Sequence, residues 1–212
     1  LAKLLRAKSA EDLEQKTVGH NDHVIIIGDG ISGELLASSL RTLSIETVVL
    51  EMNSDNVSKG RERGDPVYYA DATSEEALGH AHLESCRAVV VMINDHGATK
   101  RVLATIDRMQ VDVPVFVRTQ YLAGIDDFTK FKTTGVVACE LEGGLEVLSR
   151  VLRKLEVPKN LIIREIDNAR AQTIDTERKF KENALPLHEH KQLSGLLVEN
   201  ILLMKGSRAE GK

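Results

Sequence analysis

The chain has 212 residues, of which 42% are hydrophobic, 28% are charged and 3% are aromatic. This length and apolar content suffice to bury one α/β core with a smaller lobe, so we expect one principal domain and an appendage. The formal net charge is -4, and the acidic and basic residues are interspersed. The sequence lacks the basic field that tracks a nucleic-acid backbone, which excludes nucleic acid as an expected partner.

The start of the chain and its cysteines bear on its cellular setting. Residues 1–21 are charged and mixed, and the sequence starts at Leu1 rather than Met, so we interpret them as a linker from a longer upstream part. No apolar run approaches the roughly 18 residues that span a bilayer. Cys86 and Cys139 are too few for a disulfide framework. They indicate a reducing, cytosolic setting and two small buried side chains.

Six short apolar runs, rich in β-branched residues, predict the strands of a sheet. They cover residues 23–28, 46–51, 66–70, 86–93, 114–119 and 135–140. Stretches with helical period lie between them. This alternation predicts a doubly wound, Rossmann-like α/β fold, with a parallel six-stranded sheet and helices on both of its faces.

Three of the intervening helices carry apolar residues at helical spacing. We expect each of these sets to form one face that packs on the sheet. The sets are Leu35, Leu36, Leu40 and Leu43; Val102, Leu103, Ile106 and Met109; and Leu145, Leu148, Val151, Leu152 and Leu155.

The sequence changes character after the domain predicted over residues 22–158. Residues 159–212 begin with a long charged helix, which Pro186 ends, and continue with an amphipathic stripe. The stripe consists of Leu193, Leu196, Leu197, Ile201 and Met204. We expect a C-terminal helical extension, which either packs back on its own domain or forms a dimer or docking surface.

The stretch "HVIIIGDGISGELLASSL", residues 23–40, contains three glycines at the spacing G-x-G-x-x-G. In a strand-turn-helix unit, Gly28 permits the tight turn, Gly30 lets a ligand approach the backbone, and Gly33 allows the helix to pack closely on the strand. The free N–H groups of the helix N-terminus then point at a phosphate. The turn follows a predicted strand and opens a predicted helix, and this context predicts a nucleotide-binding site.

Glu51 ends the next predicted strand, about 20 residues further on, where an acidic residue accepts hydrogen bonds from a ribose. Its charge disfavours a 2′-phosphate and therefore NADP. A solvated carboxylate at a strand end is the alternative. Asp71 ends the third strand, where the wall for an adenine base is expected. The same segment has the composition of a helix start, so Asp71 also fits a capping role.

Three more polar residues follow later strands and fall on the same carboxyl edge of the sheet, where open α/β sheets bind ligands. Asn94 and Asp95 follow the fourth strand, and Arg118 ends the fifth. Arg118 is the best placed cation for a phosphate or carboxylate, with a structural salt bridge as the alternative.

Candidate catalytic residues are hard to find in this sequence. Little sequence remains for a substrate domain that could place a proton donor near a hydride acceptor. The pairs His80 with His82 and His188 with His190 lack further ligands for a metal. We therefore expect no catalytic residues, no metal and no enzyme. A small NAD-dependent oxidoreductase acting with a separate partner is the rival hypothesis.

The sequence resembles the RCK or KTN (TrkA-N-like) regulatory nucleotide-binding domain of potassium transport systems. The version it most resembles is the cytosolic C-terminal domain of Kef-type potassium/proton antiporters. The resemblance covers about residues 22–158 and rests on the glycine turn, "TVVLE", "VYYADATSEEAL", "RAVVVMINDHGATKRVLATI", "VPVFVRT" and "TTGVVACELEGGLEVLSRVLRKL". In the family the segment before the adenine side usually reads G-D-A-[ST], so Ala70 replaces a glycine.

The resemblance implies a homodimer that binds AMP, NAD(H) or ATP/ADP and transmits occupancy to an attached membrane protein, at the cytoplasmic face of the membrane. That protein would be an antiporter, or alternatively a potassium channel with the domain in its gating ring. The resemblance also implies a dimerisation role for the helices after Pro158. It implies that phosphate lies near Gly28, Asp29, Gly30, Ile31, Ser32 and Gly33, the ribose near Glu51 and Met52, and the adenine near Asp71, Ala72 and Thr73. Asn94 and Asp95 would line the same site, and Arg118 would lie near phosphate or, in Kef systems, near the glutathione site.

Two positions of the turn depart from the family. Kef-type turns often carry an arginine after the second glycine, where this chain has Ile31, and Asp29 adds a carboxylate before it. A diphosphate would meet less compensating charge than usual, so we expect AMP to be favoured over NADH or ATP. Alternatively, Asp29 points away from the ligand and costs little, because repulsion across several ångströms of solvent is modest.

Overall fold

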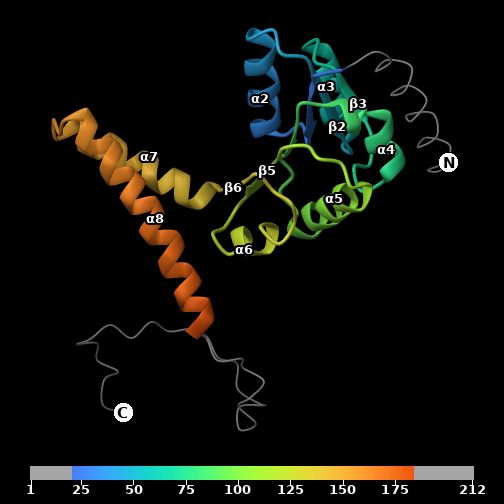
Figure 1. The fold of residues 1–212 in the computed structure, drawn as a ribbon. Helices are drawn as coiled ribbons and strands as arrows, with labels where there is room; N and C mark the ends of the chain where they lie inside the picture. The colour runs from blue at the N-terminus through green and yellow to red at the C-terminus, as the bar shows by residue number, and fades with distance from the viewer. Residues whose placement is uncertain (1–20, 184–212) are drawn as a thin grey trace, which may run out of the picture. The chain divides into compact units, whose positions relative to one another are not determined.

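The computed structural model describes residues 21–183. Most of the predicted linker and the whole stripe from Leu193 to Met204 lie outside the described residues. Six parallel strands form one sheet in the order β3-β2-β1-β4-β5-β6 (Figure 1). The strands are β1 (Val24–Ile27), β2 (Thr47–Glu51), β3 (Val67–Tyr69), β4 (Ala88–Val91), β5 (Val115–Thr119) and β6 (Gly135–Ala138).

Helices connect the strands in chain order. They are α2 (Ile31–Thr42), α3 (Ser54–Glu62), α4 (Glu75–His80), the short 3₁₀ helix η1 (Leu83–Ser85), α5 (His96–Met109), α6 (Gly124–Phe128), α7 (Cys139–Lys154) and α8 (Lys159–Asn183). The strand order reverses between β1 and β4, which both lie at the centre of the sheet. The predicted doubly wound, six-stranded parallel fold with C-terminal helices is confirmed.

Helices cover both faces of the sheet, because successive side chains of a strand point to opposite faces. On β1, Val24 and Ile26 join the cluster that contains Ala37 of α2 and Val57 of α3. Ile25 and Ile27 join the opposite cluster, which includes buried side chains of α4, α5 and α6. Burial on both faces explains why the strands appear in the sequence as continuous apolar runs.

Two strands end two residues earlier than predicted. The fourth ends at Val91, and the sixth ends at Ala138, so Cys139 already opens α7. Both cysteines are free and half-buried rather than buried. Helix α7 begins directly after β6, with no loop between them. A search for runs of β-branched residues therefore does not separate the start of the helix from the end of the strand.

The predicted face of α2 is partly wrong. Leu35 and Leu43 are 66% and 68% exposed. The buried residues of this helix are Gly33 and Ala37, with Leu36 and Leu40 packed beside the core. Small residues face the sheet because the helix approaches β1 closely, so the largest side chains are displaced to its flank.

The predicted buried face is confirmed in one of the two later helices and is partly wrong in the other. In α5 the predicted face is confirmed: Val102, Leu103 and Ile106 are buried, and Met109 packs against them. In α7 the buried residues are Leu141, Leu145 and Ser149, whereas the predicted core residues Val151 and Leu155 are 49% and 67% exposed. Only part of the predicted apolar stripe of α7 is therefore buried against other described residues.

By its contacts, the chain divides into two compact units, Leu1–Ile174 and Asp175–Lys212. Within the first unit, α7 and the start of α8 share a small apolar cluster that includes Leu145 and Ile166. A bidentate ion pair between Arg170 and Glu142, at 2.9 and 3.0 Å, joins the same two helices. None of the helices in the described part of the chain is long and apolar enough to cross a lipid bilayer.

Candidate nucleotide-binding site

The glycine turn joins β1 to α2 and has the tight geometry that its spacing predicts. Gly28 has φ = +104°, a conformation that side chains rarely adopt. A Cβ atom on Gly33 would lie 2.0 Å from the carbonyl oxygen of Gly28, so the helix touches the turn at this point. No heavy atom lies within 4 Å of a Cβ placed on Gly30. The middle glycine is therefore open toward a ligand.

The N-terminus of α2 lacks a side-chain cap. Gly30 is the N-cap residue and makes no capping hydrogen bond, and Ile31 behind it is 91% exposed. Asn53 caps α3 and Asp95 caps α5 with their side-chain oxygens, whereas α4, α6 and α7 also start without a side-chain cap. The first amide groups of a helix need an acceptor, and they favour an anion. The uncapped start of α2 therefore offers a place for a phosphate.

Glu51 lies beside the turn, as its position predicts. Its Oε2 accepts a hydrogen bond from the backbone N–H of Asp29 at 2.7 Å. Its Oε1 accepts from the backbone N–H groups of Met52 and Asn53, each at 2.7 Å. These backbone donors hold the carboxylate at the carboxyl end of β2, and Met52, which is 51% exposed, flanks it.

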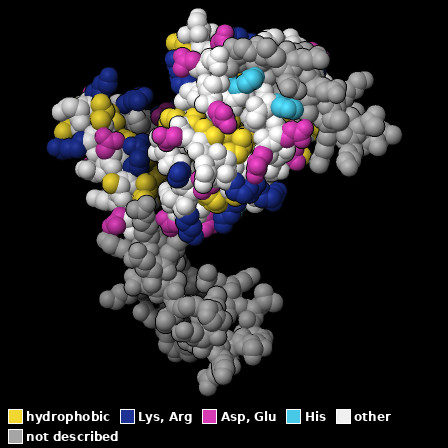
Figure 2. Space-filling view, turned by 45° about the vertical axis from the view of Figure 1, so that its right-hand side comes forward, with side chains coloured by type: hydrophobic (Ala, Val, Ile, Leu, Met, Phe, Trp, Pro, Cys, Tyr) yellow, Lys and Arg dark blue, Asp and Glu magenta, His cyan; other side chains and the backbone are white. Residues whose placement is uncertain are grey.

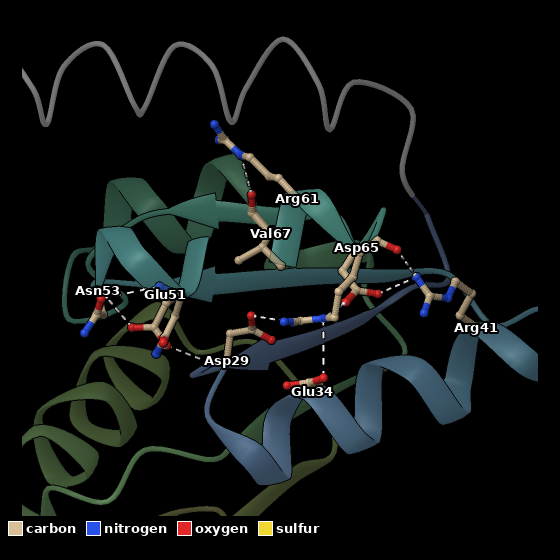
Figure 3. Close-up of polar contacts among 10 residues, drawn as sticks. Asp29, Glu34, Arg41, Glu51, Asn53, Arg61, Asp65 and Val67 are labelled. Atoms are coloured by element: carbon tan, nitrogen blue, oxygen red, sulfur yellow. Dashed lines mark hydrogen bonds and ion pairs between the residues drawn. The ribbon is translucent and has the colours of Figure 1, made fainter. Parts of the chain in front are cut away.

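The side chain of Asp29 does not face solvent. It is fully buried, and its Oδ2 accepts a hydrogen bond from Nη2 of Arg63 at 2.9 Å. Figure 3 shows Asp29 on the side of Glu34 and Asp65, which belong to the same group of charged side chains. Burial raises the pKa of Asp29, and the Arg63 guanidinium opposes that rise. Of the two orientations considered for this carboxylate, the structure has the one in which it is buried beside Arg63 and does not point into solvent.

Asp71 organises the loop that follows β3. Its Oδ1 accepts from the backbone N–H of Thr73 at 3.0 Å and from the Thr73 hydroxyl at 2.7 Å. Ala72 between them is buried. Helix α4 begins two residues later, with Ser74 as its N-cap residue. Asp71 thus fixes the turn before the helix, which is close to the capping role considered from the sequence.

The fourth and fifth strands place the remaining predicted residues at the same edge. Arg118 donates hydrogen bonds to Asn94, to Gln120 at 3.4 Å and to the Cys139 sulfur at 2.9 Å. Within residues 21–176, no carboxylate pairs with this guanidinium, so the alternative of a structural salt bridge is not found among them. Asp95, by contrast, is used as the cap of α5. Arg118 lies on β5, two strands away from the glycine turn on β1.

The sequence of residues 24–138 matches the TrkA-N domain family. The chain belongs to this family. Its relatives include a putative K⁺ efflux antiporter KefB from Alkalimonas amylolytica, 28% identical over 191 residues, or 89% of this chain and 29% of the relative. The chloroplastic K⁺ efflux antiporter 1 of Arabidopsis thaliana is 30% identical over 78% of this chain and 14% of its own length. The chain thus spans less than a third of these relatives.

Two solved structures share the fold of this TrkA-N domain. The TrkA-N domain of the inner membrane protein YbaL from Escherichia coli is 26% identical, with a TM-score of 0.55 over 65% of this chain and 98% of that one. A Kef C-terminal domain from Shewanella denitrificans, solved in an AMP-bound form, is 14% identical. Its TM-score is 0.62 over 73% of this chain and 94% of that one. The expected family and its Kef-type relatives are confirmed.

Several residues of the site were not anticipated from the sequence of this TrkA-N domain. Arg63 follows the end of α3, 34 residues beyond its partner Asp29, and no local pattern joins the two. Gln120 lies two residues beyond Arg118 on the same segment, whereas Cys139 contacts Arg118 because β5 and β6 pair. Asn53 was recognisable, since a capping residue directly before a helix is a local signal. The turn itself is thus visible in the sequence, whereas its supporting contacts are not.

Proposed function

We propose that this TrkA-N domain is a sensor that binds an adenine nucleotide and gates an attached potassium/proton antiporter of Kef type. The observation that carries the proposal is the uncapped N-terminus of α2 behind an open glycine turn, with Glu51 fixed beside it. Helix amides for phosphate and a carboxylate for ribose hydroxyls are the two groups that a nucleotide requires at such an edge.

The other predicted residues take the remaining parts of the ligand. The segment from Asp71 to Thr73 lies toward the adenine, because it follows β3 on the far side of β2 from the turn. Asn94 and Arg118 lie on the other side of the turn, at the carboxyl ends of β4 and β5. Arg118 brings a cation to that region, and its partners Asn94 and Gln120 are neutral.

AMP is the nucleotide that we favour over ADP, ATP and NAD(H). The first turn of α2 provides amides for one phosphate, and Ile31 provides no cation for a second. The carboxylate of Asp29 is paired and buried, so the preference rests on the missing cation rather than on repulsion from Asp29. The Kef domain from Shewanella denitrificans was solved with AMP, which agrees with this choice.

Calorimetry with AMP, ADP, ATP, NAD and NADH tests the ligand. We expect micromolar binding, tightest for AMP, that Glu51→Ala and Arg118→Ala each weaken. Glu84→Ala, at an exposed site in η1, serves as the control and should bind like the wild type. Failure of all five nucleotides to bind would contradict the proposal. Turnover of NADH with an acceptor would instead favour the oxidoreductase.

Gating requires that the nucleotide bind one arrangement of the whole protein better than another, since equal affinity shifts nothing. The relatives named above are efflux antiporters, and this chain corresponds to 29% and 14% of their lengths. We therefore place the domain at the cytoplasmic face of a membrane, attached to a transport domain. Potassium/proton exchange by the full-length protein in vesicles should respond to AMP, and Glu51→Ala should abolish that response without removing basal exchange.

We also propose that the domain forms a homodimer. Val147 and Val151 of α7 and Leu155, which directly follows this helix, are 63%, 49% and 67% exposed. They recur at intervals of four, so they form one apolar stripe. On one face of the sheet, Phe116 of β5 and Val137 of β6 are also 40% and 48% exposed. Two uncovered apolar surfaces on one chain are typical of an interface between copies.

Light scattering tests the dimer. We expect the wild type to be a dimer and Val151→Asp to be a monomer, because a charge in a buried apolar interface is costly. Leu43→Asp is the matched control, since Leu43 is 68% exposed at the end of α2, and it should remain a dimer.

Figure 2 shows one face of the molecule, where acidic and basic side chains are mixed rather than gathered into one basic field.

A further inference from the structure

Asp29 lies inside the molecule, in a space that a glycine of the neighbouring helix leaves open. A Cβ atom placed on Gly60 of α3 would lie 2.8 Å from Oδ2 of Asp29. The other carboxylate oxygen, Oδ1, is buried and accepts no hydrogen bond from the described residues. The carboxylate is therefore only half satisfied in its buried position, and that position depends on its partners.

A single cation contacts this carboxylate. Nη2 of Arg63 donates to Asp29 Oδ2 at 2.9 Å, while Nε of the same guanidinium donates to Asp65 at 2.9 Å and lies 3.6 Å from Glu34. The second arginine of the group, Arg41, pairs with Asp65 at 2.6 Å. Within the described residues, Arg63 alone contacts and offsets the charge of Asp29.

We infer that Arg63 is a positioning residue of the nucleotide site, which holds the Asp29 carboxylate beneath the glycine turn and away from the phosphate. The inference rests on the proposed function and adds to the site a residue that lies outside the glycine turn. Without Arg63, the buried carboxylate would face Asp65 and Glu51, which both disfavour its charge. The open space nearest to the turn lies around Gly30, where the ligand is expected.

The expected loss of nucleotide affinity follows from the negative charge that Asp29 would bring near the phosphate. A carboxylate about 6 Å from a phosphate, at an effective dielectric constant of about 20–40, weakens binding about 10- to 100-fold. The penalty applies only while the carboxylate is ionised, so it should shrink as pH falls. A neutral side chain at position 29 should remove the penalty altogether. Arg63 therefore acts through Asp29, and this can be separated from direct contact with the ligand.

The experiment is a double-mutant cycle read by AMP calorimetry at about pH 8 and pH 5.5. The variants are Arg63→Gln, Asp29→Asn and the double variant, with Arg63→Lys as the conservative replacement and Arg41→Gln as the matched control in the same group of charges. We expect Arg63→Gln to weaken AMP binding about 10- to 100-fold at pH 8 and less at pH 5.5. The double variant should regain most of the wild-type affinity, and Arg63→Lys should lie between.

Each alternative outcome is informative. A double variant as weak as Arg63→Gln would overturn the inference, because Arg63 would then act on the ligand or on the fold and not through Asp29. If Arg63→Gln does not fold, Arg63→Lys and the double variant provide the same comparison. If the wild type binds no nucleotide, the proposed function fails. The Asp29 carboxyl pKa, measured by carbon NMR in the wild type, Arg63→Lys and Arg63→Gln, then decides the positioning. Arg63→Gln should raise this pKa because the guanidinium that lowers it is lost, and an unchanged pKa in both variants overturns the inference.

Discussion

The contact between Gly33 and the glycine turn predicts that a single methyl group will disturb both the fold and the site. In Gly33→Ala, the new Cβ atom would lie 2.0 Å from the carbonyl oxygen of Gly28, whereas real Cβ atoms essentially never come closer than 3.0 Å. The helix and the turn must therefore separate by at least 1 Å, since 3.0 minus 2.0 leaves that difference. Both contact partners belong to the backbone or are fixed to it, so no side chain can rotate away.

The cost can be estimated from the two effects of the substitution. Overpacking a close contact costs about 1–3 kcal/mol, and the rigid partners here place it at about 3 kcal/mol. Replacing glycine by alanine within a helix returns about 1 kcal/mol. The net loss of unfolding free energy is therefore about 2 kcal/mol. With a urea m-value of about 2 kcal/mol per molar, the midpoint should fall by about 1 M.

Urea unfolding followed by circular dichroism measures this loss. Gly79→Ala is the matched control, because Gly79 lies in α4 and a Cβ atom there would meet no heavy atom within 4 Å. The control should unfold at the wild-type midpoint or slightly above it. Gly33→Ala should also bind AMP more weakly while still folded, because the amides of α2 move. An unchanged midpoint in Gly33→Ala would refute the close packing of α2 on the turn.

Two further predictions concern ionisable groups away from the turn. Burial raises the pKa of the Cys86 thiol to about 11, so Cys86 should react slowly with a thiol reagent near pH 8, and rapid labelling shown by mass spectrometry would contradict this. The hydrogen bond from Arg170 lowers the pKa of Glu142, so the folded state is stabilised above the ordinary carboxyl pKa and loses this contribution as pH falls through the folded pKa. Both side chains are more than a third exposed, so Arg170→Gln should cost only about 0.5 kcal/mol near pH 7. The difference in urea midpoint should shrink as the pH falls through the folded pKa of Glu142, and an equal difference at neutral and acidic pH would contradict the assignment.

The sheet could be predicted from the sequence because its strands are buried on both faces. Such strands appear as short β-branched runs, and the helices between them fix a parallel order. The faces of the helices were harder to predict. In α2 the residues that meet the sheet are Gly33 and Ala37, whereas Leu35 is exposed. Apolar periodicity finds large side chains and therefore misses a helix that packs through small ones.

The same limit applies more strongly to the charges of the site. The spacing of Gly28, Gly30 and Gly33 is local, so the turn and its open helix start follow from the sequence. The orientation of Asp29 is not local, because it depends on Arg63 and on the space at Gly60, more than 30 residues away in the chain. A carboxylate that the spacing assigns to the ligand is placed by the tertiary structure among the buried side chains. We therefore expect nucleotide preference to depend on which cations reach the phosphate, and Ile31 supplies none in the glycine turn. A ligand with one phosphate is the consequence we expect from that arrangement.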